Sequence, residues 1–170
     1  SDIFNLEIST SSVEINGYVE CNSSNATLNR ICESGKSSNR IIPGALVYLL
    51  WDDGYCFENP SLDCIIYLLD NDLLYSDFTH TNINGEFRFY DIPITSTGGS
   101  PNTFYVVVLL EHESYIRILD TRYDEPITFE KIVGPVFFSE QDNNFMIPVS
   151  FQTIEEVNAA VIYSYSVQLF

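Results

Sequence analysis

The strongest constraint on the fold is a period-two alternation of apolar and polar residues, interrupted by turn signals. Residues 13–21 and 86–90 alternate in this way, whereas 45–51 and 104–110 are nearly continuous apolar runs that suit buried strands. Clusters of Gly, Pro and Asn separate these segments at a spacing of roughly ten residues. Many short strands between such turns predict an antiparallel β-sandwich or barrel.

The same reasoning adds strands at 64–69, 115–119, 127–133 and 144–150. The run at 64–69 is continuous and apolar, so it is interpreted as another central strand. No internal repeat interrupts this series, and the strands follow one another along most of the chain.

One helical signal stands near the end of the chain. Thr153 and Glu156 form a capping-box pattern, in which each side chain bonds the backbone of the other. Residues 161–169 then alternate Val and Tyr with Ser and Gln, which favours a terminal strand. A single helix running to the end is the alternative. The predicted fold class is all-β, an antiparallel sandwich with additional terminal strands and at most one short helix near 153–160.

A length of 170 residues indicates one domain. Within it, residues 1–11 are expected to form an N-terminal extension strand, and residues 12–151 the β-sandwich. Residues 152–170 are expected to form the short helix and a C-terminal strand that packs on the sandwich or extends it.

The charge balance excludes several classes of partner. Lys and Arg number 7 against 24 Asp and Glu, which gives a formal net charge of −17. Nucleic-acid binding relies on basic patches, and anionic membranes attract cations, so neither partner is expected. No apolar run approaches the roughly 20 residues of a membrane helix, so no membrane insertion is expected. The start at Ser1 is interpreted as that of a processed secretory protein.

Four cysteines, Cys21, Cys32, Cys56 and Cys64, lie in the first half of the chain. An even number indicates disulfides in an extracellular protein, and three connectivities are open. The favoured pairs are Cys21–Cys32 and Cys56–Cys64, because each encloses a short, turn-rich loop that closes easily. Zinc binding is the alternative, but no Cys-x-x-Cys pair occurs and the spacings fit no known finger.

Two acceptor sequons lie close together, at Asn22-Ser-Ser24 and Asn25-Ala-Thr27. Two sequons in one polar loop, beside an expected disulfide, are typical of a glycosylated surface loop. An unmodified Ser- and Asn-rich loop is the alternative. Together with the cysteines, the sequons indicate an extracellular or cell-surface protein.

Acidic residues gather where strands are expected to end. Asp52 and Asp53 follow one such strand, and Asp70 and Asp72 follow another. Carboxylates at strand ends are ligands that Ca²⁺ prefers, so these four form a candidate calcium site. The favoured interpretation is a dispersed acidic surface, with no cofactor, because no complete calcium-loop motif occurs.

No catalytic pattern accompanies these residues. The chain contains two histidines, His80 and His112, and neither a Gly-x-Ser-x-Gly elbow nor a His-Glu-x-x-His motif. The chain is therefore expected not to be an enzyme.

Several segments together resemble a known family. They are Val13-x-Ile-x-Gly-x-Val-x-Cys21, residues 43–53, residues 72–77 and residues 81–89, in that order. The order of these turn and strand segments is similar to that in transthyretin-like proteins of nematodes, carboxypeptidase regulatory domains and B-type repeats of collagen adhesins. The resemblance covers roughly residues 12–112, with a continuation to 151, and it implies an Ig-like or prealbumin-like sandwich.

The last of these segments, residues 81–89, has a physical reason of its own. Asn84-Gly85 is expected to supply the positive φ values of a tight hairpin turn, after which Phe87 points into the core. The chain departs from the nematode proteins in lacking their later cysteine pair and in carrying insertions at 21–32 and 56–64. Any inherited ligand preference is therefore not carried over.

The extension in front of the sandwich suggests a function. Phe4, Leu6 and Ile8 share one face and need a buried groove, and residues 9–12 form a short polar hinge. We expect this segment to act as an exchangeable strand that adds to a neighbouring subunit, with a strand on its own subunit as the alternative. The chain is thus predicted to be a self-assembling extracellular subunit of a filament or surface layer. Two alternatives stay open: a small-ligand carrier or adhesion module, and an accessory domain of a larger secreted hydrolase.

Overall fold

The computed structural model describes residues 12–34, 40–112, 116–120, 125–127 and 129–167. The elements in chain order are β1 (Ser12–Cys21), α2 (Ala26–Ser34), β2 (Leu46–Trp51), α3 (Leu62–Asp70), β3 (Tyr75–His80), β4 (Glu86–Pro93), β5 (Phe104–Leu109), β6 (Glu111–His112), β7 (Ile116–Asp120), β8 (Glu125–Ile127), β9 (Glu130–Val136), β10 (Met146–Phe151) and α4 (Ile154–Val167).

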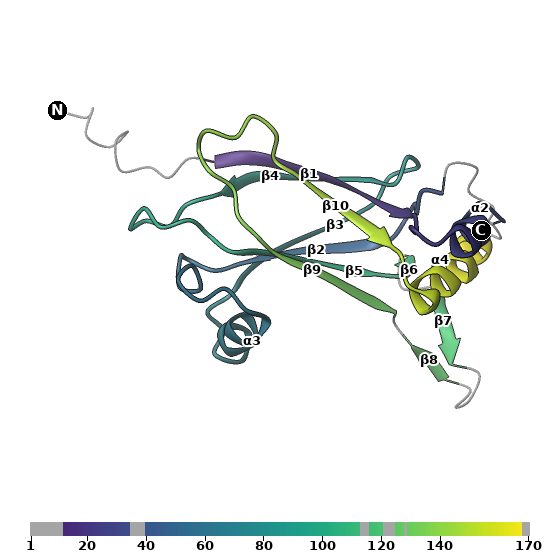
Figure 1. Cartoon of the computed structure of the whole chain (residues 1–170). Helices are drawn as coiled ribbons and strands as arrows, with labels where there is room; N and C mark the ends of the chain where they lie inside the picture. The colour runs from purple at the N-terminus through teal and green to yellow at the C-terminus, as the bar shows by residue number, and fades with distance from the viewer. Residues whose placement is uncertain (1–11, 35–39, 113–115, 121–124, 128, 168–170) are drawn as a thin grey trace.

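Two sheets lie face to face and hold the core between them (Figure 1). One has the order β10-β1-β4 and the other β3-β2-β5-β9, while β6, β7 and β8 form a small third sheet. Successive side chains of a strand point to opposite faces of its sheet, so every second residue faces the core. On β1 the buried residues are Ile15 and Val19. They share the core with Val47, Leu49 and Val106 of the other sheet. The period-two segments of the sequence therefore do form the strands of a two-layer core.

One pairing is not antiparallel. β1 pairs with β4 antiparallel, but it pairs with β10 in parallel, with Val19 opposite Val149. Two parallel neighbours need a long connection between them. Here that connection contains all of the elements from α2 to β9. The expectation of an entirely antiparallel sandwich is wrong in this respect.

The all-β fold class is also wrong, because the described chain contains three helices and is α+β. The expected strand at 64–69 is helix α3. Ser61 accepts a hydrogen bond from the Cys64 backbone at 3.2 Å and so caps the helix. Ile65 and Leu68, three residues apart, are its buried positions. A continuous apolar run fits a strand or a buried helix equally well, and the cap favours the helix.

Helix α2 was not expected, since its segment appeared to be a turn-rich loop. The Asn25 side chain accepts hydrogen bonds from the backbones of Thr27 and Leu28, at 2.9 and 3.2 Å, and caps the helix. Leu28 and Ile31 pack against the core beside buried Cys32, at helical spacing. The signals for α2 were thus present, but the sequon-rich composition obscured them.

The capping box at α4 is confirmed, but the strand after it is wrong. Thr153 Oγ1 accepts from the Glu156 backbone at 3.2 Å, and Glu156 Oε1 accepts from the Thr153 backbone at 3.1 Å. The helix then continues to Val167. Val157, Ala160 and Tyr163 repeat every three residues and are buried in the core, so the helical face, not the Val/Tyr alternation, contacts the strands.

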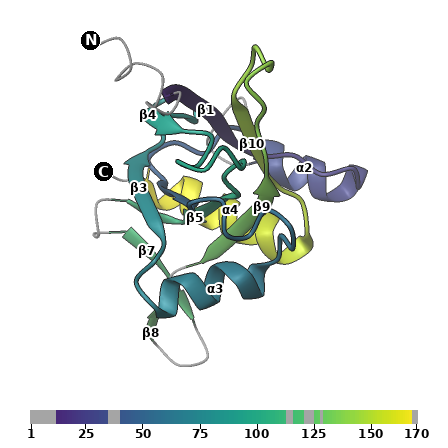
Figure 2. The ribbon, with the colours of Figure 1, turned by 90° about the vertical axis from the view of Figure 1, so that its left-hand side faces the viewer.

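Helices α2 and α4 lie side by side across one end of the two sheets, whereas α3 lies on the outer face of the β3-β2-β5-β9 sheet (Figures 1 and 2). None of the described helices has the length and apolar character needed to cross a membrane. A tight turn forms at 82–85, in which the Gly85 backbone donates to the Asn82 carbonyl at 2.9 Å, and Gly85 has a positive φ of 73° whereas Asn84 does not. The expected hairpin is wrong, because β3 pairs with β2 and β4 with β1, so this turn leads from one sheet to the other.

Candidate ligand-binding site

The outer face of the β3-β2-β5-β9 sheet carries an apolar row. The strand register places Tyr48 opposite both Phe78 and Val107, and Val107 opposite Ile132. The row therefore crosses all four strands on the face turned away from the other sheet. Phe78 is 61% exposed and Ile132 is 42% exposed, so this face is not covered like the inner one. A contiguous exposed apolar face of this kind is uncommon on proteins that bind nothing there.

Helix α3 covers one part of this face and is held there covalently. The disulfide Cys56–Cys64 joins the loop after β2 to the first turn of α3. Ile65 and Leu68 then pack with Cys56 and Tyr105 in a small cluster of their own. The disulfide and this cluster fix the position of α3 over the sheet.

A second apolar stripe on α3 is not used for this packing. Leu62, Ile66 and Leu69, spaced four and three residues apart, are 43%, 44% and 55% exposed. They border a cavity of about 430 Å³ between the helix and the sheet. This apolar groove is lined by Leu62, Ile65, Ile66 and Leu69 of α3, Tyr48 and Leu50 of β2, Tyr105, Val107 and Leu109 of β5, and Glu130 and Ile132 of β9. Its volume lies in the range of small-molecule sites.

Tyr105 lines the apolar groove and is itself 2% exposed. Its ring packs closely on the backbone of β9, since a Cβ at Gly134 would lie only 2.5 Å from Tyr105 Cδ1. Its hydroxyl is buried and has no hydrogen-bond partner among the described residues. Burial raises the pKa of the Tyr105 hydroxyl above its ordinary 10.0.

The electrostatics of the apolar groove are simple. Of the described residues that line it, Glu130 alone carries a charge, and its side chain is exposed at the end of β9. The groove can bury apolar surface and offers few hydrogen bonds, because eight of its eleven lining side chains are purely hydrocarbon. Chemically, this arrangement can hold a ligand.

Asp52 fixes the loop that leads from β2 to α3. Its carboxylate is buried and accepts backbone hydrogen bonds from Gly54 at 3.1 Å, Cys56 at 2.6 Å and Thr103 at 2.8 Å. These bonds connect the loop with its disulfide to the start of β5. A carboxylate satisfied in this way supports the backbone.

The structure does not bring the four predicted calcium ligands together. Asp52 is buried and bonded to backbone, whereas Asp53, Asp70 and Asp72 are exposed. In the described residues, no group of three His, Cys, Asp or Glu side chains is arranged to hold a metal ion. Asp70 and Asp72 lie at the end of α3, which was expected to be a strand, so the predicted strand-end cluster does not form.

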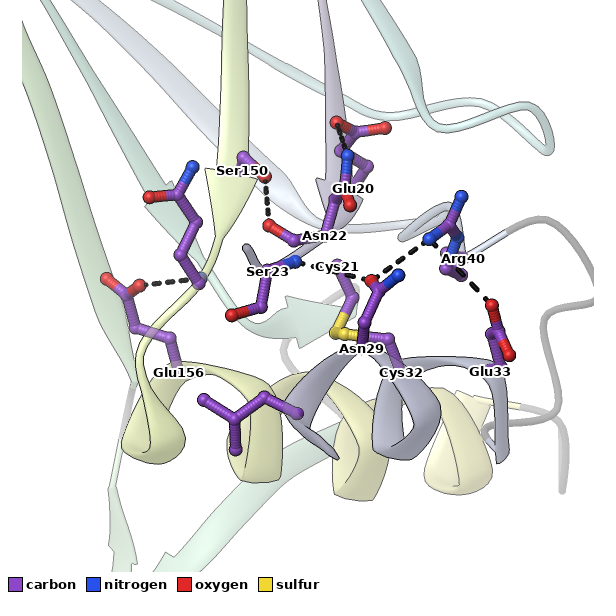
Figure 3. The surroundings of a disulfide bond; sticks show 12 residues. Glu20, Cys21, Asn22, Ser23, Asn29, Cys32, Glu33, Arg40, Ser150 and Glu156 are labelled. Carbon is purple, nitrogen blue, oxygen red and sulfur yellow. Dashed lines mark hydrogen bonds and ion pairs between the residues drawn. A yellow bond between two sulfur atoms is a disulfide. The ribbon is translucent and has the colours of Figure 1, made fainter. Parts of the chain in front are cut away.

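Both disulfides join the pairs favoured from the sequence, Cys21 with Cys32 and Cys56 with Cys64. The first links β1 to α2 (Figure 3). The sequon residues flank it differently: Asn25 is exposed at the start of α2, whereas Asn22 is half-buried. The Asn22 carbonyl accepts from Ser150 Oγ at 2.9 Å and its amide donates to Glu20 at 3.3 Å.

The predicted interface residues Phe4, Leu6 and Ile8 lie outside the described residues. The exchangeable strand therefore stays a prediction.

His80, one of the two histidines considered from the sequence, lies exposed on β3.

Comparisons with known proteins give no family. No family model and no curated protein matches the chain. One solved structure, a 9R-lipoxygenase from Cyanothece PCC8801, is similar over 88% of this chain and 19% of its own, at 11% identity and a TM-score of 0.35. The expected likeness to transthyretin-like proteins gains no support from these comparisons.

Sequence reasoning missed the apolar groove because it treated 64–69 as a strand. The available signal was the spacing of Leu62, Ile66 and Leu69 behind the Ser61 cap. With a helix there, the outward-facing residues of 45–51 and 104–110 become the opposite wall of a cavity.

Proposed function

We propose that the protein is a non-enzymatic extracellular binding module that holds a small apolar molecule in the groove between α3 and the sheet. The observation that carries this proposal is the apolar lining of the 430 Å³ cavity, contributed by α3 and three strands. Among the alternatives raised by the sequence, this is the small-ligand carrier.

The energetics favour occupation of the apolar groove. Burying a large aliphatic side chain from water gains roughly 1.5–3 kcal/mol, and the stripe on α3 is only partly buried. A ligand lying between this stripe and the sheet removes apolar surface from water on both walls. The walls are rigid, since one is a sheet and the other a disulfide-linked helix, so little ordering cost opposes binding.

The two disulfides support the extracellular location. Disulfides persist in oxidising compartments and are rare in the cytosol. Both enclose short loops, and the pair Cys21–Cys32 is buried in the core. The net charge of −17 also means that the chain is repelled by nucleic acid and by anionic surfaces.

The test is titration with an apolar fluorescent probe, N-phenyl-1-naphthylamine. Ile66→Trp fills the apolar groove, and Ile162→Trp makes the same change on the exposed surface of α4, where Ile162 is 52% exposed. Probe binding is expected in the natural chain and in Ile162→Trp, and a loss of tenfold or more in Ile66→Trp. Equal binding by both variants, or no binding by the natural chain, contradicts the proposal.

A second candidate is self-assembly by strand addition, and the β3 edge favours it. Within the described strands, β3 pairs only with β2, and it contains neither proline nor lysine, although Asp77 places one charge on it. Tyr75 and Phe78 on this strand are 53% and 61% exposed. Residues 2–10 of a neighbouring copy are the proposed added strand.

Light scattering coupled to size exclusion tests this candidate. Deletion of residues 1–10 and the edge variant Phe78→Lys are both expected to convert an assembly into folded monomers. Ile83→Lys, in the exposed turn after β3, is the matched control. A natural chain that is monomeric at high concentration, or assembly that survives the deletion, would contradict this candidate.

A further inference from the structure

We infer that the ligand of the apolar groove is a small organic cation, with an apolar body that lies between α3 and the sheet and one ammonium group that pairs with the Glu130 carboxylate. This inference rests on the proposed function and names the chemical class that the groove would select.

The first reason is the position of Glu130. It lines the groove, and the strand register places it opposite Leu109, which lines the groove as well. Residues two apart on a strand share a face and lie about 7 Å apart, so Glu130 stands beside Ile132 on the outer face of the sheet. The Glu130 side chain is exposed, so its carboxylate is accessible to an occupant of the groove.

The second reason is that no described side chain neutralises this carboxylate. Glu130 takes part in none of the ion pairs among the described residues. The adjacent Lys131 projects from the other face of β9, where it donates a 2.6 Å hydrogen bond to Glu156. The described lining of the groove contains neither lysine nor arginine. A ligand ammonium group would therefore be the counterion of Glu130.

The third reason is the charge of the whole chain. A net charge of −17 concentrates cations near the surface and keeps anions away. A carboxylate ligand of the same size is repelled by this field and by Glu130, whereas a neutral ligand gains nothing from either. A metal ion is disfavoured, because it buries no apolar surface and the described residues bring no three His, Cys, Asp or Glu side chains together to hold one.

The experiment compares three probes that share a naphthalene ring. At neutral pH, 1-naphthylmethylamine is a cation, 1-naphthalenemethanol is neutral and 1-naphthoate is an anion. Each competes with N-phenyl-1-naphthylamine, at low ionic strength, for the natural chain, Glu130→Gln and Glu140→Gln. Glu140→Gln is the matched control, because it removes the same charge from an exposed position outside the groove lining.

The natural chain is expected to bind the amine about two- to fivefold more tightly than the alcohol, the range for a pair with an exposed carboxylate, and to bind 1-naphthoate most weakly. Glu130→Gln is expected to bind the amine and the alcohol equally and to leave the affinity for the alcohol unchanged. Glu140→Gln is expected to keep the preference for the amine.

The outcomes separate this inference from the proposed function. If the natural chain binds amine and alcohol equally, or if both Gln variants change the preference alike, Glu130 does not select the ligand, although the groove still binds. If no probe binds the natural chain, or Ile66→Trp binds all three, the groove proposal itself fails. A measurement on the natural chain covers a misfolded variant: the ¹³Cδ shift of Glu130 must move with the amine and not with the alcohol.

Discussion

Lys131 on β9 donates a 2.6 Å hydrogen bond to Glu156, the residue that closes the capping box of α4. Both side chains are 17% exposed. The other oxygen of Glu156 accepts from the backbones of Gln152 and Thr153, at 2.9 and 3.1 Å. One carboxylate therefore joins an edge strand to the start of the C-terminal helix.

This carboxylate makes stability depend on pH. Burial alone raises the pKa of Glu156, but the hydrogen bonds from Lys131, Gln152 and Thr153 and the Lys131 charge outweigh it, so the pKa lies below its ordinary 4.5. Its stabilising contribution is present above pH 4.5 and is lost as the pH falls through the lower folded-state pKa.

Glu156→Gln is therefore expected to lower the free energy of unfolding by about 1 kcal/mol at pH 7, and by less at pH 3. Urea denaturation at both pH values measures this difference. The exposed neighbour Glu155, changed to Gln, should show no such effect. A penalty for Glu156→Gln that stays constant across this range would contradict the argument.

Asp52→Ala is expected to destabilise the fold by about 2–4 kcal/mol, because three buried backbone donors lose their acceptor. Asp53→Ala, one position along on the exposed surface, should change stability by less than about 0.5 kcal/mol. Thermal and urea unfolding of the two variants provide the comparison. Similar losses for both would show that the Asp52 carboxylate does not hold the loop.

Gly17→Ala is expected to cost about 1–3 kcal/mol by overpacking the core. An added Cβ would lie 2.1 Å from Phe87 Cζ and 2.3 Å from the Ile147 carbonyl oxygen, so neighbours on both sides of β1 would have to move. Gly98→Ala is the control, since its Cβ would meet nothing nearer than Ser96 Oγ at 3.8 Å. If Gly17→Ala unfolds at the same urea concentration as Gly98→Ala, the packing described here is incorrect.

Expression in a eukaryotic secretory pathway is expected to place a glycan on Asn25 and not on Asn22. Asn25 is exposed, and it caps α2 through its oxygen, not through the nitrogen to which a glycan attaches. Glycopeptide mass spectrometry gives the site directly. Occupancy at Asn22, which is half-buried and bonded to Glu20, would contradict the prediction.

Two variants separate the glycan from the cap. Asn25→Asp keeps the capping oxygen and Thr27→Ala keeps the asparagine, so both should lose the glycan without uncapping α2. Asn25→Ala removes the cap as well and is expected to cost about 1 kcal/mol more.

Strands with strict alternation were predictable from the sequence. In β1 and β4, buried residues such as Ile15 and Phe87 alternate with polar ones, so one face had to be the core. The disulfide pairs were also predictable, because each closes a short loop. β3 was not among the strands expected from alternation, since its residues YSDFTH are mostly polar and belong to an edge.

The helices were not predictable by period alone. In α4, the alternation of Val161, Tyr163 and Tyr165 coincides with a helical face through Val157, Ala160 and Tyr163, and only packing decides between them. In α3, every position from 64 to 69 is apolar, so no period is visible. The apolar groove lies between α3 and the sheet, so it could not be predicted once residues 64–69 were interpreted as a strand.

The parallel pairing of β1 with β10 has a consequence for biosynthesis. β1 leaves the ribosome before the other described strands, yet one of its two sheet neighbours is Met146–Phe151, the last of the described strands to follow. Until then β1 has an unpaired edge, and the inner layer lacks Ile147, Val149 and Phe151. Completion of the three-stranded sheet must therefore wait until Met146–Phe151 has left the ribosome, and nascent chains that stop before Met146 would be substrates for chaperones and not folded intermediates.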